Sequence, residues 1–195
     1  MDKSNTEQDK KRTSQHVMLD YLHDLVFLLA ILLIIFVLVF RIVVVSGPSM
    51  ESTLTDGDYL IVLSSTFCGD PEPGDIVIVS KESFNDGEPI VKRVIATEGQ
   101  HVEIFSDSGL VYVNGELLDE PYISTAYGYG NYDDISLTVD EGCVFVMGDN
   151  RGNSTDSRSQ RIGQVDVREI VGEAIFLAFP GSTAGQRDFG RIGAP

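Results

Sequence analysis

The stretch that decides the fold is LVFLLAILLIIFVLVFRIVVV, residues 25–45, which leads directly into SGPSM, residues 46–50. Residues 25–40 carry no charge, and the long side chain of Arg41 can reach a lipid–water interface. At about 1.5 Å per residue, a helix over residues 25–45 is roughly 32 Å long, enough to cross the hydrocarbon core of a bilayer. We therefore expect one N-terminal transmembrane helix at residues 25–45.

A cleavable secretory signal is the alternative interpretation of this run. The apolar part of such a signal is only about 7–15 residues long and is followed by a small-residue cleavage site. The run observed here is longer, and only three residues separate its end from Ser49. These features favour an anchor that the protein retains.

Basic residues predict the orientation of the anchor, because positive charge near a span stays on the cytoplasmic side. Only Arg41 lies at the far end of the run, whereas several basic residues precede it, namely Lys3, Lys10, Lys11 and Arg12. We expect a single-pass protein of the cell membrane, with residues 1–24 as a cytoplasmic tail and the remainder extracytoplasmic.

After the anchor the sequence changes to short runs rich in β-branched residues, separated by Gly, Pro, Asn and Asp. This pattern predicts a mainly β, antiparallel domain over residues 46–180, because no helical period alternates with the strands. A Gly-rich stretch over residues 181–195 is expected to be a flexible C-terminal tail. The predicted strands are residues 59–63, 76–80, 90–96, 101–104, 110–113, 144–147 and 170–179, and residues 110–118 are predicted to form a hairpin.

The charge of the chain is concentrated outside the anchor. The formal net charge is −16, and residues 1–45 hold five basic and five acidic groups, so the whole excess lies on residues 46–195. Such an acidic surface repels nucleic acid phosphates, which excludes nucleic acid as a partner. The simplest explanation of the acidity is solubility, including solubility in a salty habitat.

Two cysteines, Cys68 and Cys143, belong to the extracytoplasmic part, where a disulfide can persist. The sequence does not decide whether they pair or remain free thiols. Neither has metal-ligand spacing with any of the three histidines, so we expect no metal site.

Ser49 is a candidate nucleophile because it stands where the chain leaves the apolar run and turns at Gly47 and Pro48. A serine in such a turn is more often only a turn residue, so it needs a base to be of catalytic interest. Gly47 also lets a substrate backbone approach closely.

Lys92 is the candidate base. In a strand over residues 90–96, Lys92 shares one face with apolar side chains, and Arg93 is the single cation of the other face. Burial without a carboxylate partner lowers the pKa of a lysine, and a neutral amine can remove the proton of a hydroxyl. A lysine at a sheet edge that extends to water is the alternative.

A polar segment over residues 148–158 follows the apolar residues 144–147. We expect it to fold back onto the site rather than to be a plain surface loop. There Ser154 would orient the lysine amine, and Asp156 and Arg158 would pair to brace the segment.

Taken together, these segments resemble the bacterial type I signal peptidases, membrane-bound enzymes that remove signal peptides from exported proteins. The similarity runs from the anchor to about residue 180, and its four sequence boxes occur in order. The boxes are Ser49-Met50 with Thr53-Leu54 and Gly57-Asp58, then Gly74 to Val77, then Lys92 to Ile95, and finally Gly148 to Arg158.

The resemblance implies roles for individual residues. Ser49 would be the nucleophile and Lys92 the general base, with no cofactor. Ser154 would hydrogen-bond to that lysine, and Asp156 with Arg158 would be a structural pair near the site. The implied substrates are secreted preproteins, bound as extended chains with small side chains before the cut.

This chain departs from the family pattern at three positions. Ser52 stands where proline is common, and Gln100 replaces a common aspartate. Gly47 occupies a position where some members have a serine that donates to the oxyanion, so that donor is missing here.

Two other functions compete with this interpretation. Self-cleaving proteins of the SOS-repressor kind use the same pairing of serine and lysine, but they act in the cytoplasm, which the anchor argues against. A membrane-tethered β domain that only binds a partner would make Ser49 and Lys92 incidental.

Overall fold

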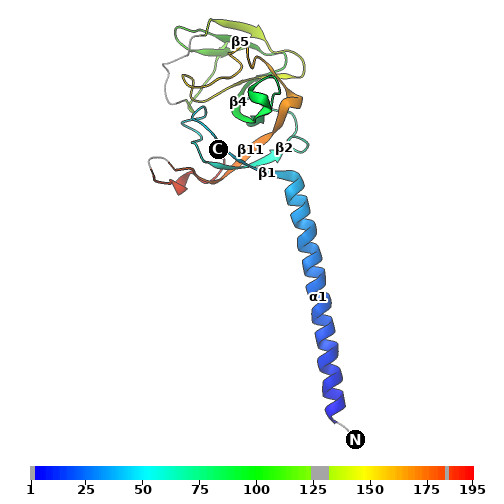
Figure 1. The fold of residues 1–195 in the computed structure, drawn as a ribbon. Helices are drawn as coiled ribbons and strands as arrows, with labels where there is room; N and C mark the ends of the chain where they lie inside the picture. Colours follow the sequence, from blue (N-terminus) through cyan, green and yellow to red (C-terminus); the bar gives the residue numbers. More distant parts are fainter. Residues whose placement is uncertain (1–2, 124–131, 183–184) are drawn as a thin grey trace. The chain divides into compact units, whose positions relative to one another are not determined.

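The structure is a computed structural model that describes residues 3–123, 132–182 and 185–195. The chain divides after Val39 into two compact units, a helical one and a β domain. The first unit is α1, Lys3–Val39, one unbroken helix in Figure 1. Its part Val17–Val39 is long and apolar enough to cross a membrane, and none of that part is buried in the protein.

The bounds of α1 differ from those expected for the anchor. The helix ends at Val39, and the next residues form strand β1, Phe40–Val44, which pairs with β2. The β-branched residues 42–44 fit a strand better than a helix, and pairing with β2 adds ladder hydrogen bonds that a longer helix would lose. At the other end the backbone is helical from Lys3, where we expected a flexible tail.

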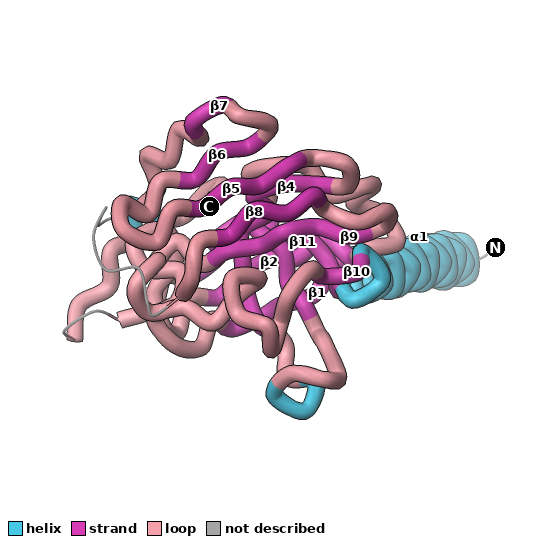
Figure 2. The backbone as a smooth tube through the Cα atoms, turned by 90° about the horizontal axis from the view of Figure 1, so that it is seen from above, coloured by secondary structure: helices cyan, strands magenta, loops and turns pink. Residues whose placement is uncertain are grey.

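The β domain contains two antiparallel sheets, seen from above in Figure 2. The larger sheet has seven strands in the order β1-β2-β11-β3-β4-β9-β10, and the smaller has four in the order β7-β6-β5-β8. The remaining strands of the larger sheet are β2 Tyr59–Ser64, β3 Ile76–Val79, β4 Ile90–Thr97, β9 Cys143–Met147, β10 Val165–Asp166 and β11 Ile170–Phe179. Those of the smaller sheet are β5 His101–Ile104, β6 Val111–Val113, β7 Glu116–Leu117 and β8 Ile135–Thr138. Three short 3₁₀ helices complete the described elements, η1 Asn85–Gly87, η2 Val167–Glu169 and η3 Phe189–Arg191.

The predicted mainly β, antiparallel class is confirmed. All seven predicted strands are present, with ends that differ by at most one residue, and β6 and β7 form the predicted hairpin. Strands β1, β8 and β10 were not predicted. Residues 122–132 hold four tyrosines, and their sequence predicts an exposed loop, but this stretch lies largely outside the described residues.

Strand β4 is the central element for the site because its residues pack into the apolar core of the larger sheet and into the cluster shared with the smaller sheet. Its residues 91–96 are all buried, and the strand lies between β3 and β9 in the larger sheet. Ile95 and Ala96 pack with Phe145 of β9 and with residues of the smaller sheet in one apolar cluster. A side chain on β4 is therefore held rigidly and shielded from water.

Candidate active site

The segment over residues 45–58, which we call the nucleophile loop, holds Ser49 between two buried side chains. Val45 precedes the turn, and Met50 follows Ser49 directly; both belong to one apolar cluster. Gly47 has a φ of +87°, in the region that strongly favours glycine. A Cβ at Gly47 would meet no atom within 4 Å, so this side of Ser49 is open.

Lys92 approaches Ser49 from β4. Its side chain is buried, with 2% of the residue exposed, and its Nζ lies 2.8 Å from the Ser49 Oγ. The same Nζ donates a hydrogen bond to the Val91 carbonyl oxygen, also at 2.8 Å. The two residues that the sequence singled out, 43 positions apart, are thus in direct contact.

The surroundings of Lys92 favour its neutral form. Burial lowers the pKa of the amine to about 8, although the carboxylates of Asp156 and Asp149 act in the opposite direction. Each of these carboxylates pairs with an arginine, and in the described chain Lys92 itself forms no salt bridge. Desolvation therefore prevails over the attraction of the two carboxylates.

Asp149 links the lysine strand to the nucleophile loop, a role that the sequence did not predict. Its carboxylate accepts hydrogen bonds from Arg93 Nε at 2.9 Å and Nη2 at 2.8 Å, and from the Thr53 hydroxyl at 2.5 Å. The Tyr122 ring covers the Arg93 guanidinium at 4.1 Å. Arg93, the single cation of the second face of β4, is therefore buried and fixed.

The polar segment after β9 folds back against Ser49, as expected. The Asn150 N–H donates to the Ser49 carbonyl oxygen at 3.0 Å, and its side-chain amide donates to the Pro48 carbonyl oxygen at 3.0 Å. Gly148 is wedged between two neighbours: a Cβ there would lie 2.5 Å from the Ser49 carbonyl oxygen and closer still to Ser154 Oγ. Only glycine fits at this position without displacing Ser49.

Ser154 lies near the site without the hydrogen bond expected of it. Its Oγ is buried and has no partner among the described residues, Lys92 included. It packs against Gly148, which in turn contacts Ser49. An unpaired buried hydroxyl is costly, so its rotation toward a polar group in the site would be favourable.

Asp156 and Arg158 form a buried ion pair with two hydrogen bonds, Nε to Oδ1 at 2.8 Å and Nη2 to Oδ2 at 2.9 Å. Asp156 also accepts from the Gly148 N–H at 2.9 Å, and Arg158 donates to the Arg151 carbonyl oxygen at 2.9 Å. The pair therefore fixes both ends of the segment that contacts Ser49.

The backbone beside Lys92 is partly unpaired. On one side, β4 pairs with β3 from Ile90 onward, but on the other side pairing with β9 begins only at Arg93. Strand β1 is the outer strand of the same sheet. Residues 90–92 on the β9 side and the outer edge of β1 therefore lie outside the strand ladders of this sheet.

Other sequence expectations concern cysteines and metals. Cys68 and Cys143 are both free thiols, so the question of their pairing is answered in favour of two separate cysteines. Within the described ranges, no group of three or more potential metal ligands occurs.

Known proteins resemble this chain over most of its length. A family model described as "Signal peptidase, peptidase S26" matches residues 18–179. "Signal peptidase I" of Bacillus licheniformis is 32% identical over 181 residues, covering 89% of this chain and 95% of the relative. "Signal peptidase I T" of Bacillus subtilis is 36% identical over 186 residues, covering 91% and 93%. A crystal structure of a signal peptidase I from Enterococcus faecalis is 34% identical, covers 53% of this chain and 96% of that chain, and superposes with a TM-score of 0.44.

Proposed function

This chain belongs to the signal peptidase family, peptidase S26, and on that premise we propose that it cleaves signal peptides from exported preproteins with Ser49 as nucleophile and Lys92 as general base. The observation that carries the proposal is the 2.8 Å contact between Lys92 Nζ and Ser49 Oγ, made by an amine that is buried away from water.

The chemistry follows from that contact. The neutral amine of Lys92 takes the Ser49 proton while Oγ bonds to the scissile carbonyl carbon. As the tetrahedral intermediate collapses, the Lys92 ammonium gives its proton to the leaving amine, and an ester to Ser49 remains. Lys92, neutral again, then takes a proton from water as that water attacks the ester carbon. As the bond between Ser49 Oγ and the carbonyl carbon breaks, the Lys92 ammonium returns the proton to Oγ, and the new carboxylic acid ionises to solvent.

The developing oxyanion needs a donor. In the described chain the Ser49 N–H has no hydrogen-bond acceptor, so it is free to donate to that oxygen. Gly47 has no side chain to donate, and its positive φ disfavours a serine substituted there. The Ser49 N–H is therefore the main donor to the oxyanion, and the open space beside Gly47 admits a water as a second donor.

The substrate binds as an extended chain between unpaired strand edges. The backbone of residues 90–92 on the β9 side is adjacent to Lys92, and a substrate strand placed there runs past Ser49. Shallow pockets that admit small side chains at the first and third positions before the cut would set the specificity.

Location supports the same function. We place Val17–Val39 as a single membrane anchor, with the N-terminus in the cytoplasm and the β domain outside the cell membrane. Ser49 follows this span by ten residues (39 to 49), so the reaction occurs close to the outer membrane surface, where preprotein cleavage sites emerge.

The test is cleavage of a model preprotein by the intact protein in detergent, with the cut site read by mass spectrometry. We expect a single cut after the signal peptide, and a rate at least about 1,000-fold lower for Ser49→Ala and for Lys92→Met. Lys81→Met is the matched control, because Lys81 is another lysine of this domain, paired with Glu169, and does not contact Ser49. Cleavage that survives either dyad substitution would overturn the proposal.

A further inference from the structure

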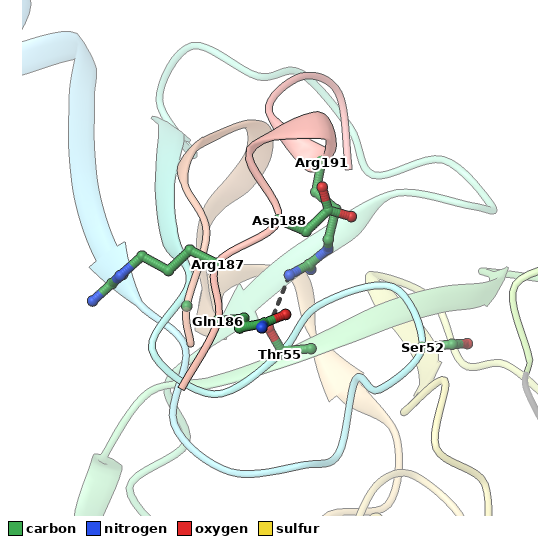
Figure 3. Close-up of a pocket in the computed structure, with 7 residues that line it drawn as sticks. Ser52, Thr55, Gln186, Arg187, Asp188 and Arg191 are labelled. Carbon is green, nitrogen blue, oxygen red and sulfur yellow. Dashed lines mark hydrogen bonds between the residues drawn. The ribbon is translucent and has the colours of Figure 1, made fainter. Parts of the chain in front are cut away.

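One guanidinium outside the matched family region reaches into the nucleophile loop. Arg191, in η3, donates to the Thr53 carbonyl oxygen and the Thr55 hydroxyl, both at 2.9 Å. It also donates to both carboxylate oxygens of Asp58, at 3.2 and 2.7 Å. Figure 3 shows Arg191 directed toward Thr55, with their hydrogen bond as the dashed line. A single side chain thus contacts three residues of this loop.

Asp58 explains why a cation is needed there. The residue is fully buried, and burial alone would raise the pKa of its carboxyl. Hydrogen bonds from Arg191, the Gly181 N–H and the Thr55 N–H outweigh burial and hold the pKa below its ordinary value. The charged carboxylate then connects the end of the nucleophile loop to the C-terminal segment, since it accepts hydrogen bonds from Thr55 of the loop and from Gly181 and Arg191 of that segment.

The end of the loop is tied to Ser49 by the backbone. The N–H groups of Thr53 and Leu54 both donate to the Met50 carbonyl oxygen, at 2.9 and 2.8 Å. The Gly47 N–H donates to the Asp56 carboxylate at 2.8 Å. Ser49 lies between these two attachments, so a shift of residues 53–58 moves the turn that presents its hydroxyl.

The segment that carries Arg191 is ordered by contacts of its own. Gly193 bridges to Leu177 of β11, and the Phe189 ring packs edge-on against Phe179 with centroids 5.6 Å apart. This differs from the flexible tail expected over residues 181–195. A cavity of about 570 Å³ lies between this segment and the nucleophile loop, and Arg191 reaches across it.

We propose that Arg191 is a positioning residue for catalysis, which holds the nucleophile loop so that Ser49 Oγ stays within reach of Lys92 Nζ. The inference rests on the proposed Ser49–Lys92 dyad. It assigns a role to a segment beyond residue 179, where the family match ends.

The test is steady-state cleavage of the model preprotein by the intact Arg191→Lys variant. Lysine keeps the charge beside Asp58, but its single nitrogen with three donors cannot reproduce the four hydrogen bonds that the two guanidinium nitrogens make to Thr53, Thr55 and Asp58. We expect kcat to fall about 10- to 100-fold because Ser49 is misplaced, with KM within about twofold because the strand edges are unchanged. The pH midpoint of the residual activity should stay that of the wild type, since the surroundings of Lys92 are intact.

Arg187→Lys is the matched control. Arg187 belongs to the same segment, but Figure 3 shows it pointing away from Thr55, and it donates to the Pro180 carbonyl oxygen at 2.7 Å. We expect its kcat within about twofold of wild type. An equal loss in Arg187→Lys, a wild-type kcat in Arg191→Lys, or a change confined to KM would overturn the inference.

A second variant covers the case in which Arg191→Lys does not fold. Arg191→Met combined with Asp58→Asn buries no unpaired charge, and the same loss of kcat at unchanged KM is expected of it. A wild-type kcat in this double variant would also overturn the role of Arg191. Failure of the dyad itself is distinguishable, because Ser49→Ala would then remain active whatever Arg191 does.

Discussion

At the scale of single residues, the state of one amine decides what the site can do. Lys92 is deeply buried, and its pKa falls to about 8 because desolvation exceeds the pull of Asp156 and Asp149. An amine with this pKa is about half neutral in mildly alkaline solution, and it remains a strong enough base to accept a hydroxyl proton. Neither a fully solvated lysine nor one in a salt bridge would satisfy both conditions.

The pH dependence of cleavage follows from this value. The base acts when uncharged, so we expect kcat/KM to rise with one ionisation centred near pH 8 and to level off above it. The measurement is kcat/KM of the intact protein on a model preprotein from pH 5.5 to 10. A profile that stays flat down to pH 5.5 would contradict the role of Lys92.

Stability should respond to the same amine, because a buried charge costs the folded state free energy. Below pH 8 Lys92 is protonated in the folded and unfolded states, and the folded state bears the full cost of a buried charge. Between pH 8 and 10.5 only the unfolded state holds the proton, so wild-type stability rises with pH across that window. A pKa lowered from 10.5 to about 8 corresponds to about 3 kcal/mol.

Lys92→Met should therefore be inactive but more stable at neutral pH. We expect its free energy of unfolding to exceed that of the wild type by about 1–3 kcal/mol at pH 7, and the difference to vanish near pH 11. Urea unfolding of the intact protein in detergent, followed by tyrosine fluorescence, measures both values. A variant less stable than wild type at pH 7 would show that the charged amine is well accommodated.

At the scale of elements, close backbone approach holds the polar segment against Ser49. Gly148 at the end of β9 leaves no room for a Cβ between Ser154 and the Ser49 carbonyl oxygen. In Gly148→Ala the added Cβ must displace a neighbouring residue, and its two nearest neighbours are Ser154 and Ser49. We expect kcat, normalised to folded protein, to fall about 10- to 100-fold.

Gly172→Ala provides the comparison for Gly148→Ala. A Cβ at Gly172 would clash as severely, but with the Leu63 carbonyl oxygen of β2, away from the dyad. We expect Gly172→Ala to lower the melting temperature while kcat per folded molecule remains near wild type. If both variants lost kcat equally, the effect of Gly148→Ala would be one of general stability.

The sequence singled out Ser49, Lys92 and most strands because each of these signals is local to its own segment. Lys92 was recognised within an apolar run, and Ser49 within a turn directly after one. Strand β1 was missed because its residues continue the apolar run of the anchor, and a short apolar run fits a helix or a strand equally well. The partners Arg93–Asp149 and Asp58–Arg191 are 56 and 133 positions apart, a separation at which no local pattern specifies a pair.

At the scale of the whole molecule, most basic side chains of the β domain form ion pairs within that domain. Ion pairs engage Lys81, Arg93, Arg151, Arg158, Arg168 and Arg191, each with a carboxylate. Three of these arginines are buried, namely Arg93, Arg151 and Arg158. Arg93 and Arg158 form the ion pairs that lie beside the dyad. The net charge of −16 is consequently carried by acidic groups that face solvent, where like charges repel one another.

This arrangement predicts that salt stabilises the protein. Repulsion among surface carboxylates is relieved on unfolding, because the chain expands, and salt screens that repulsion over about 4 Å at 0.5 M against roughly 20 Å at 0.02 M. The buried pairs are screened far less, so their contribution persists. We expect the melting temperature of the intact protein to rise by several degrees between 0.02 and 0.5 M NaCl, measured by differential scanning calorimetry in detergent.

In a triple variant with three exposed acids neutralised, Asp107→Asn, Glu116→Gln and Glu141→Gln, the rise should be smaller. A melting temperature that falls with salt would mean that surface ion pairs outweigh the net repulsion, and that the acidity serves something other than a soluble, self-repelling surface.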